Sequence, residues 1–309
     1  MKKLKVLVTG GAGFIGSHVS RLLLDAGHEV CILDNLSHGY EENVDKRVKL
    51  VVGDIADSNK TIEALLGVDA VIHMASLTIV PDSVKDPIKY CDSNVLGTVK
   101  FLESMRASNV KKIIFSSSAC VYGSPKNLPI KEDSPLQPEN LYGATKASIE
   151  TFLQAYNSSY NFDVTILRYF NPYGPGKLYK PITHAIPNFI QATLAKKPIP
   201  LFWKGEQIRD FIYIEDLAQA HVDVLKLNNF NIFNLGMENG VKIKDVVKLI
   251  FEIVGYEVPI KDFGERQGDV WVNYASSEKL YKIVGWRAKF SLREGLSKTI
   301  DYYKQYPLI

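Results

Sequence analysis

The chain has 309 residues, of which 46% are hydrophobic, 23% charged and 11% aromatic. This composition is typical of a globular protein and excludes disordered, collagen-like and disulfide-scaffold classes. The net charge of +3 gives no reason to expect nucleic acid or an acidic membrane surface as a partner. At roughly 150 residues per domain, the length predicts two domains.

The cysteines and the N-terminal residues indicate the compartment. Cys31, Cys91 and Cys120 are odd in number and widely spaced, so neither a disulfide framework nor a zinc site is expected. The apolar run behind the N-terminal lysines is too short for a secretory signal, and no 18-residue apolar stretch could span a bilayer. No spacing of His, Asp and Glu suggests a metal. We therefore expect a cytoplasmic protein that binds neither a membrane nor a metal.

The first half of the chain alternates short apolar β-branched runs with amphipathic segments. The predicted strands are residues 5–9, 30–34, 48–52, 70–73, 113–117 and 165–169. The predicted helices between them are residues 14–24, 59–66, 94–108 and 144–160. This rhythm of βαβ units predicts an α/β fold, with a doubly wound parallel sheet of the Rossmann type covered by helices on both faces.

The pattern changes after residue 171. The later elements are predicted as a loop at 172–181, strands at 200–202, 210–212 and 231–235, and helices at 187–195, 214–227, 243–254, 277–284 and 292–303. The helix at 214–227 and the strand at 231–235 are expected to return to the main sheet. The predicted division is a dinucleotide-binding domain over residues 1–170, with returning segments near 211–236, and a smaller mixed α/β substrate domain over 171–309.

A glycine-rich loop joins the first predicted strand to the first predicted helix. Gly10, Gly13 and Gly16 stand in G-x-x-G-x-x-G spacing, with Phe14 and Ile15 opening the helix. Without Cβ atoms the backbone can approach a pyrophosphate, which the free N–H groups and the positive helix end then hold. An ordinary glycine-rich turn is the alternative, but the flanking strand and helix favour a dinucleotide-binding loop.

Acidic residues follow the second and third predicted strands. Asp34, beside Asn35, lies 18 residues after Gly16, where a carboxylate can accept hydrogen bonds from the adenine ribose 2′-OH. The same charge repels a 2′-phosphate and favours NAD over NADP, although a strand-end Asp can also simply cap a turn. Asp54 and Ile55 are placed to meet the adenine edge, and an Asx-turn explains Asp54 equally well.

Tyr142 and Lys146 lie at positions i and i+4, hence on one face of a predicted helix. A nearby cation lowers the pKa of a phenol toward neutral pH, which makes Tyr142 a candidate general base, and the same Lys can hold a nicotinamide ribose. Alone, such a pair is usually a solvated helix face. Ser118, at a strand end where α/β sheets bind ligands, is the predicted partner of the reacting hydroxyl, whereas Ser116 and Ser117 can equally be residues that close the strand.

With these motifs, three later segments make the chain resemble the extended short-chain dehydrogenase/reductases, and most of all the UDP-glucose 4-epimerase group of the NAD-dependent epimerase/dehydratase family. The segments are Arg168-Tyr169-Phe170-Asn171, Arg209-Asp210-Phe211 and Arg266-Gln267-Gly268-Asp269. By resemblance, the further cofactor-site residues are Met74, Ala75, Asn94 and Tyr169. The resemblance also implies contacts to the nucleotide diphosphate and ribose from Asn171, Arg209, Arg266 and Asp269, and a contact near uracil from Phe202.

The implied activity is a UDP-hexose 4-epimerase that interconverts UDP-glucose and UDP-galactose through a 4-keto intermediate, with NAD as cofactor. Asn273 matches a sugar-pocket position where a bulky Tyr is associated with exclusion of acetylated sugars, so room for UDP-N-acetylglucosamine and UDP-N-acetylgalactosamine is expected. The resemblance further implies a homodimer packed through the helices at 94–108 and 144–160.

Two alternatives stay open. One is a UDP-glucuronate 4-epimerase or another nucleotide-sugar epimerase/dehydratase, although Ala119-Cys120 stands where related dehydratases carry an acid. The other, from a different class, is a non-catalytic NAD-binding regulator of the same fold, against which Tyr142 and Lys146 argue.

Overall fold

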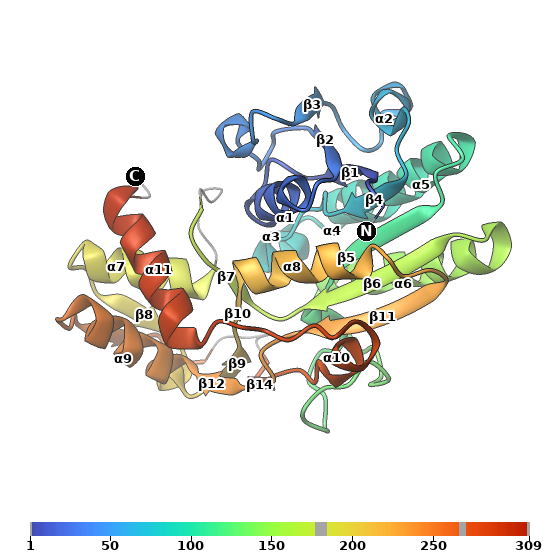
Figure 1. The fold of residues 1–309 in the computed structure, drawn as a ribbon. Coiled ribbons are helices and arrows are strands. Elements are labelled where there is room, and N and C mark those ends of the chain that lie inside the picture. Colours follow the sequence, from blue (N-terminus) through green and yellow to red (C-terminus); the bar gives the residue numbers. More distant parts are fainter. Residues whose placement is uncertain (1, 177–183, 266–269, 308–309) are drawn as a thin grey trace.

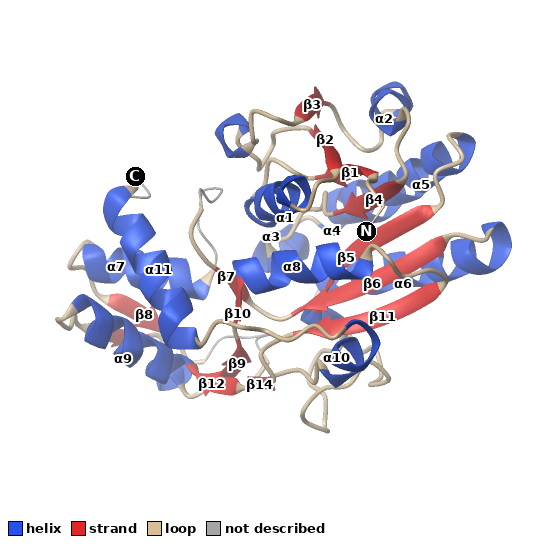
Figure 2. Cartoon of the chain, in the orientation of Figure 1, coloured by secondary structure: helices blue, strands red, loops and turns tan. Residues whose placement is uncertain are grey.

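A computed structural model describes residues 2–176, 184–265 and 270–307 of the chain. Its main feature is a seven-stranded sheet in which every neighbouring pair of strands is parallel (Figures 1 and 2). The strands in spatial order are β11 (Phe230–Leu235), β6 (Asp163–Tyr169), β5 (Lys112–Ser118), β4 (Ala70–His73), β1 (Lys5–Thr9), β2 (Glu29–Asp34) and β3 (Lys49–Val52). The order reverses between β1 and β4, and sheets of this kind bind ligands at that point, beyond the carboxyl ends of the strands.

Helices cover both faces of this sheet. On one face α1 (Phe14–Asp25) packs against α8 (Ile214–Val224) (Figure 1). The other face is covered by α2 (Ser58–Leu65), α5 (Gly97–Ala107) and α6 (Leu141–Tyr160). Successive strand residues point to opposite faces, so Val6 and Val8 belong to the core beneath α1 and α8, while Leu7 belongs to the core beneath the other three helices.

The later elements form a smaller α/β part beside the sheet (Figure 2). Its strands are β7 (Pro172–Tyr173), β8 (Ile199–Leu201), β9 (Ile208–Asp210), β10 (Ile212–Tyr213), β12 (Gly240–Lys242), β13 (Ile260–Asp262) and β14 (Val272–Asn273). Its helices are α7 (Ala185–Leu194), α9 (Ile243–Val254), α10 (Glu278–Val284) and α11 (Leu292–Gln305). Helices α7, α9 and α11 pack on one another, and α10 contacts β11.

The predicted α/β class and parallel sheet are confirmed, as is the return of the chain to the sheet at β11. The predicted strand at 210–212 is wrong as a single element, because β9 and β10 belong to different small sheets. Its division follows from Asp210, whose buried carboxylate accepts hydrogen bonds from the main chain of Met237 and Ala275, while Phe211 is buried in the core. The predicted loop at 172–181 contains β7, and residues 177–183 lie outside the described part of the chain.

Two short helices and one irregular turn between β4 and α5 escaped prediction. They are α3 (Val80–Lys85), α4 (Pro87–Tyr90) and a wide helical turn, η2 (Cys91–Leu96). Regular helix therefore begins at Gly97, not at Asn94 as the pattern predicts. None of the helices in the described ranges has the length and apolar character needed to cross a membrane.

Candidate active site

A single large cavity of about 1210 Å³ opens beyond the carboxyl ends of β1, β2, β4, β5 and β6. Ligand pockets are usually about 300–1,000 Å³, so this cavity has room for more than one small molecule. Its wall is built from both parts of the fold, since β9, β14 and the N-terminal turn of α7 also line it.

The structure brings most of the predicted site residues to this one cavity. The predicted residues that line it are Gly10, Gly13, Phe14, Ile15, Gly16, Asp34, Asn35, Asp54, Ile55, Met74, Ala75, Ser118, Tyr142, Lys146, Tyr169, Asn171, Phe202, Arg209 and Asn273. Arg266 and Asp269 lie outside the described residues.

Asn94 lies behind the cavity wall. It is fully buried; its side-chain oxygen accepts the Leu77 N–H at 2.8 Å, and its Nδ2 donates to the Leu77 oxygen and to Thr145 Oγ1. In this geometry Asn94 joins the cavity-lining segment at Leu77 to the first turns of α6. Its direct contact with a cofactor stays a prediction.

The glycine-rich loop has the shape that a dinucleotide requires. Gly10 has φ of +71°, and a Cβ there would come within 2.8 Å of the Ala75 nitrogen. A Cβ on Gly16 would collide with the main-chain oxygen of Gly10. Gly13 caps the N-terminus of α1 without a side-chain hydrogen bond, so no side chain shields the first N–H groups of the helix. These residues fit a pyrophosphate held by main-chain groups and the positive helix end.

Asp34, at the end of β2, and Asp54, after β3, each accept turn N–H groups and line the cavity. The Asp34 carboxylate accepts N–H groups from Ala12 and Leu36, each at 2.9 Å, and also lines the cavity. It therefore caps the turn while keeping acceptor capacity for a ribose hydroxyl. Asp54 accepts the Ala56 N–H at 2.8 Å in an Asx-turn and the Asn35 amide at 2.8 Å, beside the same end of the cavity.

Ser118 and Tyr142 meet at the opposite end of the nucleotide-binding crevice. Asn140 accepts the Gly143 N–H at 2.8 Å and starts α6, which places Tyr142 in the first turn. Burial raises the pKa of the Tyr142 phenol above its ordinary value, and the nearby Ser118 hydroxyl opposes this shift in part. Burial therefore outweighs the predicted lowering of the Tyr142 pKa by a nearby cation.

Lys146 itself is buried at the base of the cavity. Its Nζ donates to the main-chain oxygen of Ser116 at 2.8 Å and lies 4.8 Å from the Phe115 ring centroid. Burial lowers the pKa of the ammonium to about 7, and the negative charge of Glu150 partly opposes this shift.

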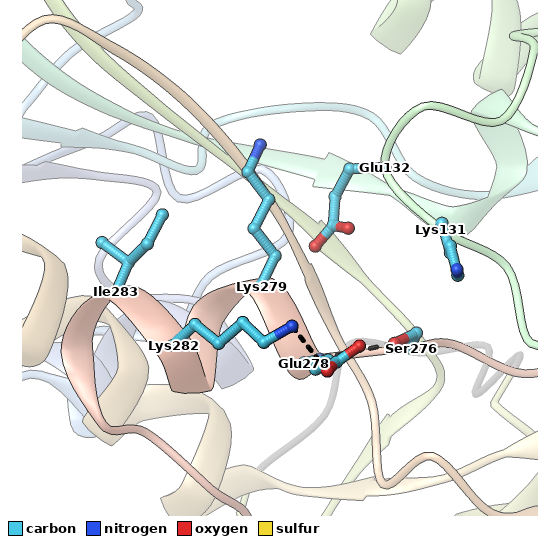
Figure 3. Close-up of a pocket in the computed structure, with 7 residues that line it drawn as sticks. All are labelled: Lys131, Glu132, Ser276, Glu278, Lys279, Lys282 and Ile283. Carbon is cyan, nitrogen blue, oxygen red and sulfur yellow. Dashed lines mark hydrogen bonds and ion pairs between the residues drawn. The ribbon is translucent and has the colours of Figure 1, made fainter.

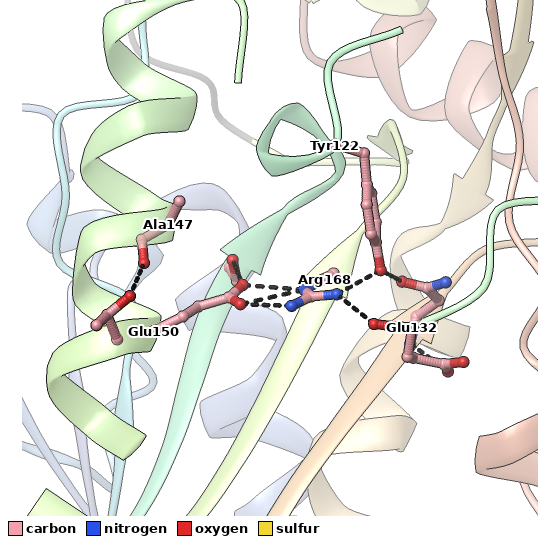
Figure 4. Close-up of polar contacts among 8 residues, drawn as sticks. Tyr122, Glu132, Ala147, Glu150 and Arg168 are labelled. Carbon is pink, nitrogen blue, oxygen red and sulfur yellow. Dashed lines mark hydrogen bonds and ion pairs between the residues drawn. The ribbon is translucent and has the colours of Figure 1, made fainter. Parts of the chain in front are cut away.

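The two serines before Ser118 have separate partners on opposite faces of β5. The Ser116 hydroxyl hydrogen-bonds the Tyr169 hydroxyl at 2.6 Å, whereas Ser117 donates to Glu150 Oε1 at 2.5 Å. Glu150 is in turn paired with Arg168, whose Nη2 lies 2.6 Å from Oε2 (Figure 4). Both serines are therefore structural partners of buried groups as well as residues of the cavity wall.

The same Arg168 extends this polar network across the sheet, away from α6. Its Nη1 donates to the Tyr122 hydroxyl at 2.6 Å and to the main-chain oxygen of Glu132 at 3.0 Å (Figure 4). Tyr122 then donates to the Asn234 side chain at 2.7 Å. Strands β5, β6 and β11 are thereby fixed to one another directly beneath the catalytic helix.

The wall that the smaller α/β part contributes to the cavity carries polar groups suited to the nucleotide of the substrate. Asn171 donates to the main-chain oxygen of Asp210 at 2.8 Å, and Arg209 donates to that of Ile208 at 2.9 Å. Phe202 contacts Phe263, with ring centroids 6.0 Å apart. A planar guanidinium and an aromatic ring in one cavity suit a diphosphate joined to a base.

Two buried amide oxygens at this end have no hydrogen-bond partner among the described residues: Gln207 Oε1 and Asn273 Oδ1. Both residues line the cavity. Unpaired buried oxygens are costly, which indicates that a ligand completes them. Gln207 was missed in the sequence because it lies just before β9, outside the predicted strands at 200–202 and 210–212.

A second, smaller pocket of about 290 Å³ lies apart from this site (Figure 3). It is lined by Lys131, Glu132, Ser276, Glu278, Lys279, Lys282 and Ile283. Glu278 pairs with Lys282 at 2.7 Å, and Glu132 Oε1 accepts the Asn234 N–H. In contrast with the large cavity, it contains no buried polar side-chain atom that lacks a partner in the described structure.

The fold and the site define a Rossmann-type, dinucleotide-dependent enzyme whose cavity is lined by Ser118, Tyr142 and Lys146. Within this class the chain belongs to the NAD dependent epimerase/dehydratase family, whose sequence pattern matches residues 6–236.

Comparisons with known proteins narrow the class further. A UDP-glucose 4-epimerase from Lactobacillus helveticus is 36% identical over 98% of both chains. The structure of a UDP-glucose 4-epimerase with UDP-glucose from Thermotoga maritima superimposes with a TM-score of 0.93 and 32% identity, covering 98% of this chain and 99% of that one. A UDP-N-acetylglucosamine 4-epimerase from Methanobrevibacter ruminantium, in complex with UDP-N-acetylmuramic acid, gives a TM-score of 0.92 and 33% identity over 99% of each chain.

Proposed function

We propose that this chain is an NAD-dependent UDP-hexose 4-epimerase that interconverts UDP-glucose and UDP-galactose. The observation that carries the proposal is one cavity with a dinucleotide loop, the Ser118–Tyr142–Lys146 set and an Arg209-containing nucleotide end. Relatives named UDP-glucose 4-epimerase match this chain over nearly its whole length. The chain divides into an NAD-binding part, residues 1–170 with returning segments near 211–236, and a mainly nucleotide-sugar-binding part over 171–309.

NAD is held by the residues of β1, α1 and β2. The loop glycines and the start of α1 hold the pyrophosphate, and the Asp34 carboxylate binds the adenine ribose and excludes a 2′-phosphate. Met74, Ala75 and Tyr169 line the nicotinamide end, and Lys146 binds the adjoining ribose. When bound, NAD would be a reversible acceptor of the hydride from C4 of the sugar, and its nicotinamide ring would add a positive charge to the site.

Tyr142 is the catalytic base for the sugar 4-OH. Ser118 hydrogen-bonds the same hydroxyl and directs its proton to the Tyr142 oxygen, while the Lys146 ammonium favours the phenolate over the phenol. The 4-keto sugar would then turn over in the cavity. Tyr142 would return its proton to the C4 oxygen, and the hydride for the opposite face would come back from the bound cofactor. Arg209 holds the diphosphate during this rotation, so that the substrate stays bound while its sugar moves.

The residues beside Ser118 favour an epimerase over a dehydratase. Ala119 and Cys120 line the cavity immediately after the catalytic serine, and neither carries a carboxyl group. Elimination of water from the sugar would need an acid there. A UDP-glucuronate 4-epimerase needs no such acid, and it is therefore the substrate alternative to test.

The sugar pocket has room for a 2-acetamido group. Asn273 lies on β14 opposite Arg209 of β9, and its unpartnered Oδ1 can accept a hydrogen bond from an acetamido N–H. The similar M. ruminantium protein is named for an acetylated substrate. UDP-N-acetylglucosamine is therefore a second substrate of this chain.

The enzyme is a cytoplasmic homodimer in which α5 and α6 of each subunit form the contact. Apolar side chains along this helix pair are exposed in the single chain, namely Leu96 just before α5 and Phe152 and Tyr160 on α6. Exposed apolar residues that gather on adjacent helices are typical of a protein interface.

The experiment is to denature the purified protein, quantify released NAD, and incubate the native protein with UDP-galactose, UDP-glucuronate or UDP-N-acetylglucosamine before separating the products. We expect bound NAD and conversion of UDP-galactose to UDP-glucose. Bound NAD without turnover of any of the three sugars would support the non-catalytic regulator instead.

A further inference from the structure

His221 is a fully buried histidine of α8 that the proposed reaction does not use. Its Nδ1 lies 2.9 Å from the main-chain oxygen of Leu217, one helical turn earlier. A carbonyl oxygen can only accept, so Nδ1 carries the ring proton. Burial lowers the pKa of the imidazole to about 4, which keeps it neutral at neutral pH. Nε2 is therefore left as a hydrogen-bond acceptor.

That acceptor is in contact with Tyr169, a residue of the cavity wall. The Tyr169 hydroxyl lies 2.5 Å from Nε2, and the two rings meet edge to face with centroids 5.6 Å apart. Because Nε2 has no proton, Tyr169 must donate to it. The Ser116 hydroxyl, 2.6 Å from the same phenol oxygen, must then donate to Tyr169. The direction of the whole chain is thus set by His221.

This chain of hydrogen bonds ends beside the catalytic groups. The main-chain oxygen of Ser116 accepts the Lys146 ammonium at 2.8 Å, and Tyr169 is the register partner of Ser118 across β5 and β6. A displaced Tyr169 ring would therefore disturb the nicotinamide end of the cavity and the strand end that carries Ser118 and holds Lys146.

We propose that His221 is a positioning residue for hydride transfer, acting through Tyr169 and Ser116. Its hydrogen bond holds the Tyr169 hydroxyl in one direction. It thereby holds in place the part of the cavity wall against which the nicotinamide binds. The inference rests on the proposed function, since it assigns Tyr169 to the nicotinamide end. The alternative is a buried histidine that only fills space in the core.

The test uses amide replacements that mimic one ring nitrogen each. The Gln side chain in His221→Gln can place an acceptor near the position of Nε2, whereas the shorter Asn in His221→Asn cannot reach Tyr169. We expect His221→Asn to lower kcat for UDP-galactose roughly 3- to 10-fold, the usual effect of one lost hydrogen bond. NAD should dissociate faster from the purified protein, measured as NAD retained after gel filtration. KM should stay the same, and His221→Gln should restore most of kcat and of NAD retention.

A matched control is His28→Asn. His28 is also a buried histidine; its Nδ1 accepts the Leu4 N–H at 3.2 Å, and it does not line the cavity. Its loss should lower Tm without changing kcat or NAD retention. Tyr169→Phe tests the same chain from the other end if the His221 variants fold poorly, and it should reproduce the loss of NAD retention.

Wild-type kcat and NAD retention in both His221→Asn and Tyr169→Phe would overturn the proposal. Equal losses in His221→Gln and His221→Asn would also overturn it, because the Nε2 acceptor would then not be the cause. A wild-type protein that contains no NAD or converts no UDP-galactose would instead contradict the proposed function, so the two failures are distinguishable.

Discussion

Lys146 and Glu150, one turn apart on α6, bind consecutive residues of β5. Lys146 donates to the main-chain oxygen of Ser116 at 2.8 Å, and Glu150 accepts from the Ser117 hydroxyl at 2.5 Å. The catalytic helix is thereby fixed to the catalytic strand at two adjacent points. The negative charge of Glu150 also raises the pKa of Lys146, against the larger effect of burial.

Removing one partner of the Glu150–Arg168 pair should destabilise the protein more than removing both partners. Arg168→Met leaves Glu150 as a buried carboxylate without its cation, which we expect to lower the free energy of unfolding by about 3–5 kcal/mol. Glu150→Leu combined with Arg168→Met removes both charges and should recover most of that loss. Urea unfolding of the two variants measures the difference. A double variant at least as unstable as Arg168→Met would contradict this interpretation.

Tyr142→Phe should abolish most turnover, because it removes the oxygen that accepts the proton and leaves the ring in place. Loss of general-base catalysis lowers kcat by roughly 10²–10⁴-fold. Bound NAD and Tm should be close to those of the wild type. The control is Tyr156→Phe on the same helix, which removes only a hydrogen bond to Glu103 and should keep kcat within about twofold. Near-normal turnover in Tyr142→Phe would exclude Tyr142 as the base.

Asp34→Ser should weaken NAD binding and reduce the discrimination against NADP. The substitution removes charge-assisted hydrogen bonds to the ribose, which corresponds to roughly 10- to 100-fold in affinity, together with the repulsion of a 2′-phosphate. Reconstitution of the stripped protein with each cofactor measures the ratio. Asp57→Ser, which changes the cap of α2 and not the cavity, is the control. An unchanged preference in Asp34→Ser would remove Asp34 from the ribose site.

Asn273→Tyr should act selectively against the acetylated sugar. The larger ring occupies the space for a 2-acetamido group, and one poorly accommodated group commonly costs about 10- to 200-fold in kcat/KM. Activity on UDP-galactose should change much less. Asn273→Ala leaves the space open and removes only the hydrogen bond to the acetamido N–H, so it should keep activity on UDP-galactose and lower that on the acetylated sugar only about 3- to 10-fold. The assignment fails if kcat/KM falls equally for both substrates in Asn273→Tyr, or if the wild type does not act on UDP-N-acetylglucosamine.

His73 should make the fold sensitive to acid. It is fully buried between Thr9 and Thr98, and burial lowers its pKa from 6.5 to about 3. Its stabilising contribution is therefore complete above pH 6.5 and is lost as pH falls toward 3, because the unfolded chain binds a proton that the folded chain excludes. The expected slope is about 1.4 kcal/mol per pH unit. His73→Asn should remove that part of the slope in urea unfolding between pH 6.5 and 4, and an unchanged slope would contradict the assignment.

Much of the site could be predicted from local sequence because its residues sit at strand and helix ends. The loop at Gly10, the acid at Asp34 and the i, i+4 pair of Tyr142 and Lys146 are set by short-range geometry, and parallel strands bring their carboxyl ends together. The later residues Asn171, Phe202 and Arg209 were placed by resemblance, since no short-range pattern links them to the first half of the chain.

Composition and periodicity by themselves determined the α/β class, the alternation of elements and the dinucleotide loop, because these depend on spacing along the chain. Only the tertiary structure decided what surrounds each group. It joined Ser116 to Tyr169 and His221, joined Ser117 to Glu150, and left Gln207 Oε1 facing no partner in the described residues. It also buried the Tyr142 phenol, and burial raises the pKa that a nearby cation was expected to lower. Desolvation and hydrogen-bond pairing depend on contacts between residues distant in sequence, and no local pattern encodes them.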